Sequence, residues 1–314
     1  MHLLIPFAAP APDAGRDPAP AALPPLPVLQ ALLARLAESA RDAADELALS
    51  PPHERALSQA FGWRGDAGRL PFAAQAAQSD GIATGAAAWG LLTPAHWHLG
   101  TDQVSLVDPA ALALDEAGSR ALFGAVRALF ADAGWALHYG APLRWYAAHD
   151  SLATLATASL DRVVGRNVDA WLGSDPAARH IRRLQSEVQM LLHEHPLNAQ
   201  REAQGLLPVN SFWLSGCGRA QPVTGPVPQV DARLRTPAMT GDRAAWAQAW
   251  QALDAGPLAA LAAAAARGQP VQLTLCGERA WVRFEAIEPG RGGLLRRLRR
   301  RWTPPHAAAV LASL

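Results

Sequence analysis

The sequence contains no lysine, so all 28 of its basic side chains are arginines. The abundance of alanine and proline makes a GC-rich coding background the simplest explanation of this bias. Arginine also binds phosphate and carboxylate groups through two parallel hydrogen bonds, so the bias is compatible with an anionic ligand. With 27 acidic residues the net charge is only +1. This even balance gives no reason to expect a nucleic-acid partner.

Cysteine is scarce as well. Cys217 and Cys276 lie in different segments, which excludes a Cys-x-x-Cys redox or zinc motif and fits a reducing compartment. No apolar run approaches the roughly 20 residues that span a bilayer. The opening segment MHLLIPFAAP has no basic residues ahead of its short apolar part, unlike a signal peptide. We therefore expect a cytoplasmic protein without a membrane span.

Apolar spacing predicts the main elements. The continuous run from His2 to Phe7 is typical of a buried parallel strand. Helical spacing predicts helices over 28–37, from about 52, and over 115–133, 178–194 and 242–267, and strand patterns cover 95–108, 135–149, 209–218 and 270–285. The middle third, 95–218, thus has the order strand, helix, strand, helix, strand, which is typical of an α+β unit.

The segment HPLNAQREAQGLLPVNSFWLSGCG, which begins at His195, carries the most specific motif. It resembles the HPVN-x-x-R … G-x-x-PAN-x-IW-x-x-G-x-G segment of the archaeal-type cofactor-independent phosphoglycerate mutases. Ten positions match: His195, Pro196, Asn198, Arg201, Gly205, Pro208, Asn210, Trp213, Gly216 and Gly218. Weaker similarity extends to GRLPFAAQA, to residues 97–133 and to the helix and strand near the C-terminus.

This resemblance implies an α/β fold: an alkaline-phosphatase-like core with an inserted α+β, ferredoxin-like cap domain. The core is expected to comprise residues 1–90 and 219–314, and the cap residues 91–218. The family's catalytic residues are not matched, however. The first strand runs LLIPFAAP where the family has Asp-Gly, and only Ser50 or Ser58 is a candidate for the phosphorylated serine.

The family's last core strand ends in Asp-His, where this chain has CGER with Cys276, Glu278 and Arg279. Two-metal phosphoryl transfer needs several hard oxygen and nitrogen ligands around the ions. Because that set is not visible in the sequence, we expect no metal site and no cofactor.

Three segments, TASLDRVVGRNVDAWL, RRLQSEVQMLLHEHP and VNSFWLSGCG, the last of which is the end of the motif that begins at His195, resemble a second family. They are similar to the E-type regulatory proteins of the pathogenicity-factor regulation cluster of plant-pathogenic proteobacteria. The name of that family implies regulation and no particular chemistry.

Eleven polar residues are candidates for binding a ligand. They are Arg144, His149 and Asp150 around the end of the aromatic strand, then Asp161, Arg162, Arg166 and Asn167, and finally His195, Asn198, Arg201 and Asn210. The second group is spaced to clamp an anion, or alternatively to form salt bridges at a helix start. In the third group, loop residues would present binding groups, or alternatively cap a helix and fix a turn.

Two His-x-His pairs, His96 with His98 and His193 with His195, have no obvious third ligand, so metal binding is not expected. Cys217 would act as a nucleophile only beside a base and with a lowered thiol pKa.

The residues and resemblances together predict a non-catalytic, regulatory relative of the mutases that binds a small phosphorylated or carboxylated ligand. One alternative is an active metal-dependent mutase or phosphoesterase with atypical ligands. A second is a protein-interaction module that uses the arginine-rich stretch LLRRLRRRW, Leu294–Trp302.

Overall fold

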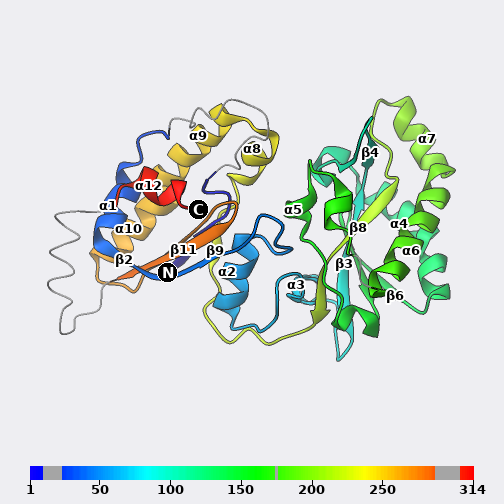
Figure 1. Cartoon of the computed structure of the whole chain (residues 1–314), viewed down its shortest axis with the longest axis horizontal. Helices are drawn as coiled ribbons and strands as arrows, with labels where there is room; N and C mark the ends of the chain where they lie inside the picture. Colours follow the sequence, from blue (N-terminus) through cyan, green and yellow to red (C-terminus); the bar gives the residue numbers. More distant parts are fainter. Residues whose placement is uncertain (10–22, 174–175, 287–304) are drawn as a thin grey trace. The chain divides into compact units, whose positions relative to one another are not determined.

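The computed structural model describes residues 1–9, 23–173, 176–286 and 305–314 (Figure 1). These residues form two compact units. Unit 1 comprises Met1–Glu46, Pro51–Gly62 and Val223–Leu314, and unit 2 comprises Leu47–Ser50 and Trp63–Pro222. The arginine-rich stretch Leu294–Trp302 lies outside the described residues. Within the described ranges, no helix has the length and apolar character that a membrane span requires.

Unit 1 is built on a five-stranded sheet in the order β2-β11-β10-β1-β9. The strands are β1 (His2–Ile5), β2 (Leu36–Ala43), β9 (Gln229–Val230), β10 (Gln272–Cys276) and β11 (Ala280–Ala286). β1 is parallel to both its neighbours, as predicted from its continuous apolar run, whereas β11 is antiparallel to β10 and β2.

The helices of unit 1 are α1 (Pro27–Arg35), α2 (Pro52–Phe61), α8 (Arg235–Thr240), α9 (Arg243–Leu253), the π-helical turn η4 (Asp254–Leu258), α10 (Ala259–Ala266) and α12 (Ala307–Ala312). Because side chains alternate along a strand, the sheet has two buried faces. Leu3 and Ile5 belong to a large core with α1, α9, α10 and α12, whereas Leu4 packs with Ala56 of α2 on the other face.

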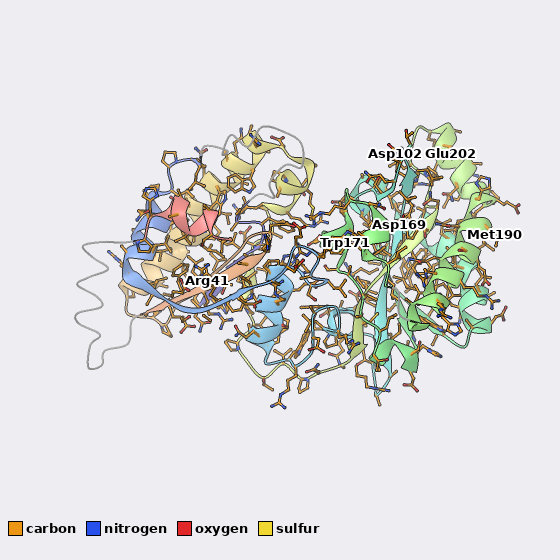
Figure 2. The ribbon with its side chains drawn as sticks, in the orientation of Figure 1. Arg41, Asp102, Asp169, Trp171, Met190 and Glu202 are labelled. Atoms are coloured by element: carbon orange, nitrogen blue, oxygen red, sulfur yellow. The ribbon has the colours of Figure 1, made fainter. Side chains whose placement is uncertain are left out.

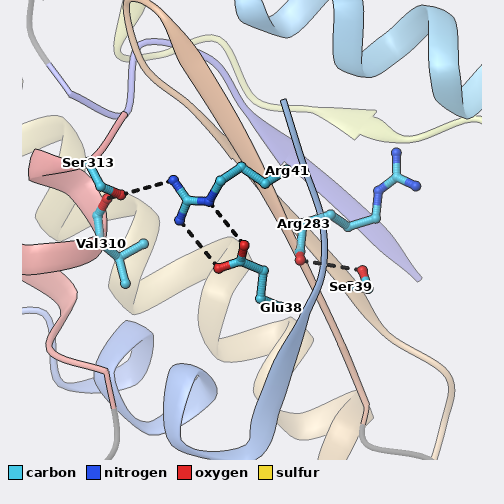
Figure 3. A network of polar contacts seen from close by, with 6 residues as sticks. All are labelled: Glu38, Ser39, Arg41, Arg283, Val310 and Ser313. Carbon is cyan, nitrogen blue, oxygen red and sulfur yellow. Dashed lines mark hydrogen bonds and ion pairs between the residues drawn. The ribbon is translucent and has the colours of Figure 1, made fainter. Parts of the chain in front are cut away.

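β2 is a polar edge strand that the sequence did not predict. Its segment LAESARDA has little apolar alternation, and it becomes a strand because β11 supplies a ladder of backbone partners. Figure 3 shows how its outer side chains are paired: Arg41 donates to both carboxylate oxygens of Glu38, at 3.0 and 3.3 Å, and to Oγ of Ser313, at 3.3 Å. Charged side chains of this kind protect an edge strand against pairing with another chain.

Unit 2 contains a four-stranded antiparallel sheet in the order β6-β7-β3-β8. Its strands are β3 (Ala88–Ala95), β6 (Ala136–Ala141), β7 (Arg144–Ala148) and β8 (Ser211–Arg219), and β4 (Trp97–Leu99) and β5 (Val104–Leu106) form a separate hairpin. Its helices are α3 (Phe72–Ser79), η1 (Pro109–Leu112), α4 (Glu116–Asp132), η2 (Asp150–Ala153), α5 (Leu160–Val163), η3 (Val168–Trp171), α6 (Pro176–His193) and α7 (Pro196–Ala203).

The chain runs β3, α4, β6, β7, α6, β8, which is the β-α-β-β-α-β order of ferredoxin-like units. The predicted α/β class with an inserted ferredoxin-like α+β unit is therefore confirmed. Residues of α4 and α6 such as Leu122, Phe130 and Leu184 share one hydrophobic core with β8 residues such as Phe212. Each such buried side chain contributes about 1.5–3 kcal/mol.

The main segment of unit 2 begins at Trp63, whereas the cap was expected to begin at residue 91, and it includes α3, which packs on this sheet. Ala73, Ala74 and Ala77 form a small core with Trp89. These small residues allow α3 to lie close to β8. A Cβ on Gly216 of β8, whose φ is +64°, would lie only 2.8 Å from the backbone nitrogen of Ala73.

His2 lies on β1 with 7% of its surface exposed, and its Nε2 is 2.9 Å from Oγ1 of Thr274. Burial, assisted by the positive charge of Arg283, lowers the pKa of His2 from 6.5 to about 4. The unfolded chain therefore takes up a proton at a higher pH than the folded chain does. Folding stability must fall as the pH decreases through this interval.

We predict that titration of His2 lowers the free energy of unfolding by about 1–3 kcal/mol between pH 6.5 and pH 4. The His2→Gln variant keeps a group that can hydrogen-bond to Thr274 but does not titrate, so its loss over the same interval should be smaller by that amount. Urea unfolding of both proteins at both pH values measures the difference. Equal losses would contradict the assignment.

Candidate functional site

The motif that begins at His195 forms the connection from α6 through α7 to β8. His195 is the N-cap of α7, where its Nδ1 accepts a hydrogen bond from the backbone nitrogen of Leu197 at 3.2 Å. Pro196 occupies the first position of the helix, where its missing N–H costs nothing. His195 therefore caps a helix, which is one of the two roles that the sequence left open for it.

Asn198 is buried and bonds three backbone groups. Its Nδ2 donates to the carbonyl oxygens of Leu192 and Val209, both at 2.8 Å, and its Oδ1 accepts from the nitrogen of Val209 at 2.9 Å. Arg201 has 5% of its surface exposed and donates from Nε to the carbonyl of Leu207, at 2.9 Å, and from Nη2 to that of Leu112. Burial lowers the pKa of Arg201 from its ordinary value.

Asn210 performs the same kind of role for the β4 strand. Its Oδ1 accepts from the backbone nitrogen of Trp97 at 2.8 Å, and its Nδ2 donates to the carbonyl of the same residue at 3.0 Å. The polar groups of Asn198, Arg201 and Asn210 are thus engaged with the backbone, which orients the loop between α7 and β8.

The segment Asp161–Asn167 is partly buried. Arg162 has 1% of its surface exposed and donates from Nε to the carbonyl of Ala48 at 2.9 Å. The guanidinium carbons of Arg162 and Arg166 lie 6.0 and 5.8 Å from the ring of Trp171. Asn167 caps η3, and the half-buried Asp161 belongs to α5.

Arg144, on β7, forms a two-point ion pair with Asp80, at 3.0 and 2.9 Å, and Tyr146 donates to the same carboxylate at 2.7 Å. These contacts, chiefly the hydrogen bond from Arg144, hold the pKa of Asp80 below its ordinary value. Burial, followed by the Asp80 carboxylate, raises the pKa of Tyr146. The sequence did not single out Asp80, because nothing in it shows that the end of α3 meets β7.

His149 and Asp150 lie at the start of η2, outside this network. The ring of His149 stacks on Trp135 with 5.1 Å between the centroids, and its Nδ1 is 2.8 Å from Oγ of Ser151. Asp150 is exposed and pairs with Arg219 at 2.9 Å. The eleven candidate residues therefore do not converge on one site.

A pocket of about 270 Å³ lies beside the motif, and we call it the α6–α7 pocket. It is lined by His96, Trp97, Leu99, Leu192, His193, Asn198, Glu202, Pro208 and Asn210. Each His-x-His pair contributes one imidazole to it, which the sequence alone could not show. Glu202, labelled in Figure 2, belongs to α7.

His96 is held in one tautomer within this pocket. Its Nδ1 is 2.8 Å from the carbonyl oxygen of Pro208, and since a carbonyl only accepts, Nδ1 carries the proton. Nε2 has no hydrogen-bond partner among the described residues. His193 and Glu202 make no side-chain hydrogen bond or ion pair within the described part of the chain, and the buried indole nitrogen of Trp97 has no partner there either.

This arrangement can bind a small polar molecule. A doubly protonated imidazole donates a hydrogen bond from each ring nitrogen, so His96 and His193 in that form can both donate to anionic oxygens, whereas the Glu202 carboxylate accepts hydrogen bonds from hydroxyl groups. Across the described ranges, no three His, Cys, Asp or Glu side chains are grouped closely enough to hold a metal ion.

Cys217 is fully buried in the core of unit 2. Burial raises the pKa of its thiol to about 12, so the sulfur stays protonated at neutral pH. A buried thiol of this kind has the properties of a core side chain and not those of a nucleophile.

We predict that Asn198→Ala lowers the free energy of unfolding by about 2–4 kcal/mol, because it removes the side-chain partner of both backbone polar groups of Val209 and one of the two donors to the carbonyl of Leu192. Asn198→Asp should lose at least as much, because it replaces the donor nitrogen with an oxygen that faces the carbonyl oxygens of Leu192 and Val209. The matched control is Gln200→Ala at an exposed position of α7, expected within about 0.5 kcal/mol of the parent. Urea unfolding measures all three. Similar losses for the Asn198→Ala and Gln200→Ala variants would refute the role assigned to Asn198.

No protein-family model matches the sequence, and no curated protein sequence matches it either. Among solved structures, the chain is similar to a cofactor-independent phosphoglycerate mutase from Thermoplasma acidophilum, with 15% identity, a TM-score of 0.38, and 90% of this chain and 89% of that chain covered. It is also similar to the PH0037 protein from Pyrococcus horikoshii, with 12% identity, a TM-score of 0.45, and 91% and 87% covered. Neither description names the E-type regulatory family.

Proposed function

We propose that this chain is a non-catalytic regulatory protein that binds a small hydroxylated anion, such as a phosphorylated or carboxylated metabolite, in the α6–α7 pocket. The observation that carries the proposal is the presence of His96, His193 and Glu202 in one pocket, with polar atoms that the described residues leave uncommitted. Small-molecule sites usually have volumes of about 300–1,000 Å³. The 270 Å³ of this pocket therefore favours a small metabolite.

The non-catalytic part of the proposal has separate support. In the motif that resembles the mutase family, the side chains of Asn198, Arg201 and Asn210 form hydrogen bonds with the backbone, which is a structural role. The first strand, β1, is moreover followed by Pro6 and Phe7 where the resembled family has a metal-binding Asp. A protein that has these backbone hydrogen bonds and the α6–α7 pocket, but not the catalytic residues, is suited to sensing a ligand.

We predict that the full chain binds 3-phosphoglycerate in calorimetric titration more tightly than it binds glycerol. His96→Gln and His193→Gln should each weaken binding by about 5–30-fold, which corresponds to the loss of one charge-assisted hydrogen bond. His180→Gln is the matched control, since His180 is exposed on α6 and does not line the pocket. If all three variants bind equally, the α6–α7 pocket is not the site.

Catalysis is tested separately. The full chain, loaded with Mn²⁺ or Zn²⁺, is expected to show no mutase or phosphatase turnover above the rate without protein. Metal-dependent turnover would establish the alternative of an active enzyme with atypical ligands. Binding without turnover is the combination that the proposal requires.

The second alternative, a protein-interaction module, concerns the stretch Leu294–Trp302. Its test should replace the arginines of that stretch and should not truncate the chain. The reason is that Val310 and Leu311 of α12, which follow it, belong to the core of unit 1.

A further inference from the structure

Unit 2 contains a second pocket, which we call the Trp171 pocket. It lies between the extended segment 155–158, the end of η3, α6 and β8. Its lining consists of Leu155, Ala156, Thr157, Ala158, Trp171, Leu172, Gly173, Ala178, Ile181, Arg182, Gln185, Trp213 and Leu214. None of the eleven residues predicted from the sequence belongs to this set.

The inner walls of the Trp171 pocket are apolar and fixed in place. Trp171 and Trp213 are 5% and 2% exposed, and the indole nitrogen of Trp213 donates to the carbonyl of Ala158 at 2.9 Å. Gln185, 4% exposed, donates from Nε2 to the carbonyl of Phe212 at 3.3 Å. The volume of the pocket is about 30 Å³. A water molecule needs about 10–15 Å³ by this measure, so the space admits only the end of a small ligand.

Arg182 is the charged member of the lining, as far as the structure describes it. It is half-buried, and its guanidinium has no hydrogen-bond or ion-pair partner among the described residues. The adjacent Arg183 differs, because its Nε pairs with Glu187 at 2.8 Å.

We propose that the Trp171 pocket binds a small apolar carboxylate, whose hydrocarbon end contacts the apolar lining and whose carboxylate pairs with Arg182. An apolar molecule without charge would bury the same surface but leave Arg182 unpaired. Inorganic phosphate would pair with Arg182 but would lose its hydration against apolar walls, which is unfavourable. The combination of walls and charge favours a short branched acid of the size of isobutyrate. The site is separate from the α6–α7 pocket, with which it shares no residue.

The test compares isobutyrate with its neutral isostere isobutyramide in NMR titrations of the full chain. The indole N–H signals of Trp171 and Trp213 report on the pocket. We expect saturable shifts with isobutyrate, and binding at least about tenfold weaker with isobutyramide. Arg182→Gln should reduce the affinity for isobutyrate to that for isobutyramide, and Arg183→Gln on the same helix should leave it unchanged.

A second variant tests the pocket by changing the size of a lining side chain without changing any charge. Ala178→Leu places a larger side chain in the lining and should abolish the binding of both compounds, while His96→Gln should affect neither. Circular dichroism and urea unfolding verify that each variant is folded. The proposal is overturned if isobutyramide binds as tightly as isobutyrate, if Arg182→Gln and Arg183→Gln have equal effects, or if no saturation occurs by about 10 mM.

Discussion

Backbone groups that are buried between α6 and β8 have to be hydrogen-bonded, and the side chain of Asn198 satisfies three of them at once. A buried group without a partner costs about 1–3 kcal/mol. By joining the carbonyl of Leu192 to both polar groups of Val209, this one amide links the end of α6 to the entry of β8. Arg201 and Asn210 make similar hydrogen bonds from their side chains to the backbone of η1 and β4. Asn198 and Asn210, which make these hydrogen bonds, also line the α6–α7 pocket.

The sequence predicted the elements whose apolar residues follow one period. The parallel strand β1, the long helices α4 and α6, and the pair β10 and β11 all lie where the pattern places them. β2 was missed because its residues are mostly polar, and its conformation is set by β11 across the sheet. β3 was missed except for its last residue, Ala95, because it follows a Gly- and Ala-rich segment and contains Pro94. That proline is tolerated because β7 pairs with β3 only over Trp89–Leu92.

The candidate site was predicted only in part, for a physical reason. A motif identifies residues that are close in the sequence, whereas the α6–α7 pocket combines residues 96–99, 192–202 and 208–210. Asn198 and Asn210 were identified, but their amides support the backbone. His96 and His193 were noted as members of separate pairs. Their presence in one pocket depends on the packing of the β4 hairpin near the end of α6, which spacing along the chain does not reveal.

The central claim is that the α6–α7 pocket binds a small anion through His96 and His193. The most direct measurement is a ¹H–¹³C NMR titration of the histidine side chains of the full chain with 3-phosphoglycerate. The account predicts that the signals of His96 and His193 shift along one common saturation curve, while that of His180 stays in place. Unchanged His96 and His193 signals at ligand concentrations of about 10 mM, or equal shifts of all three, would contradict it.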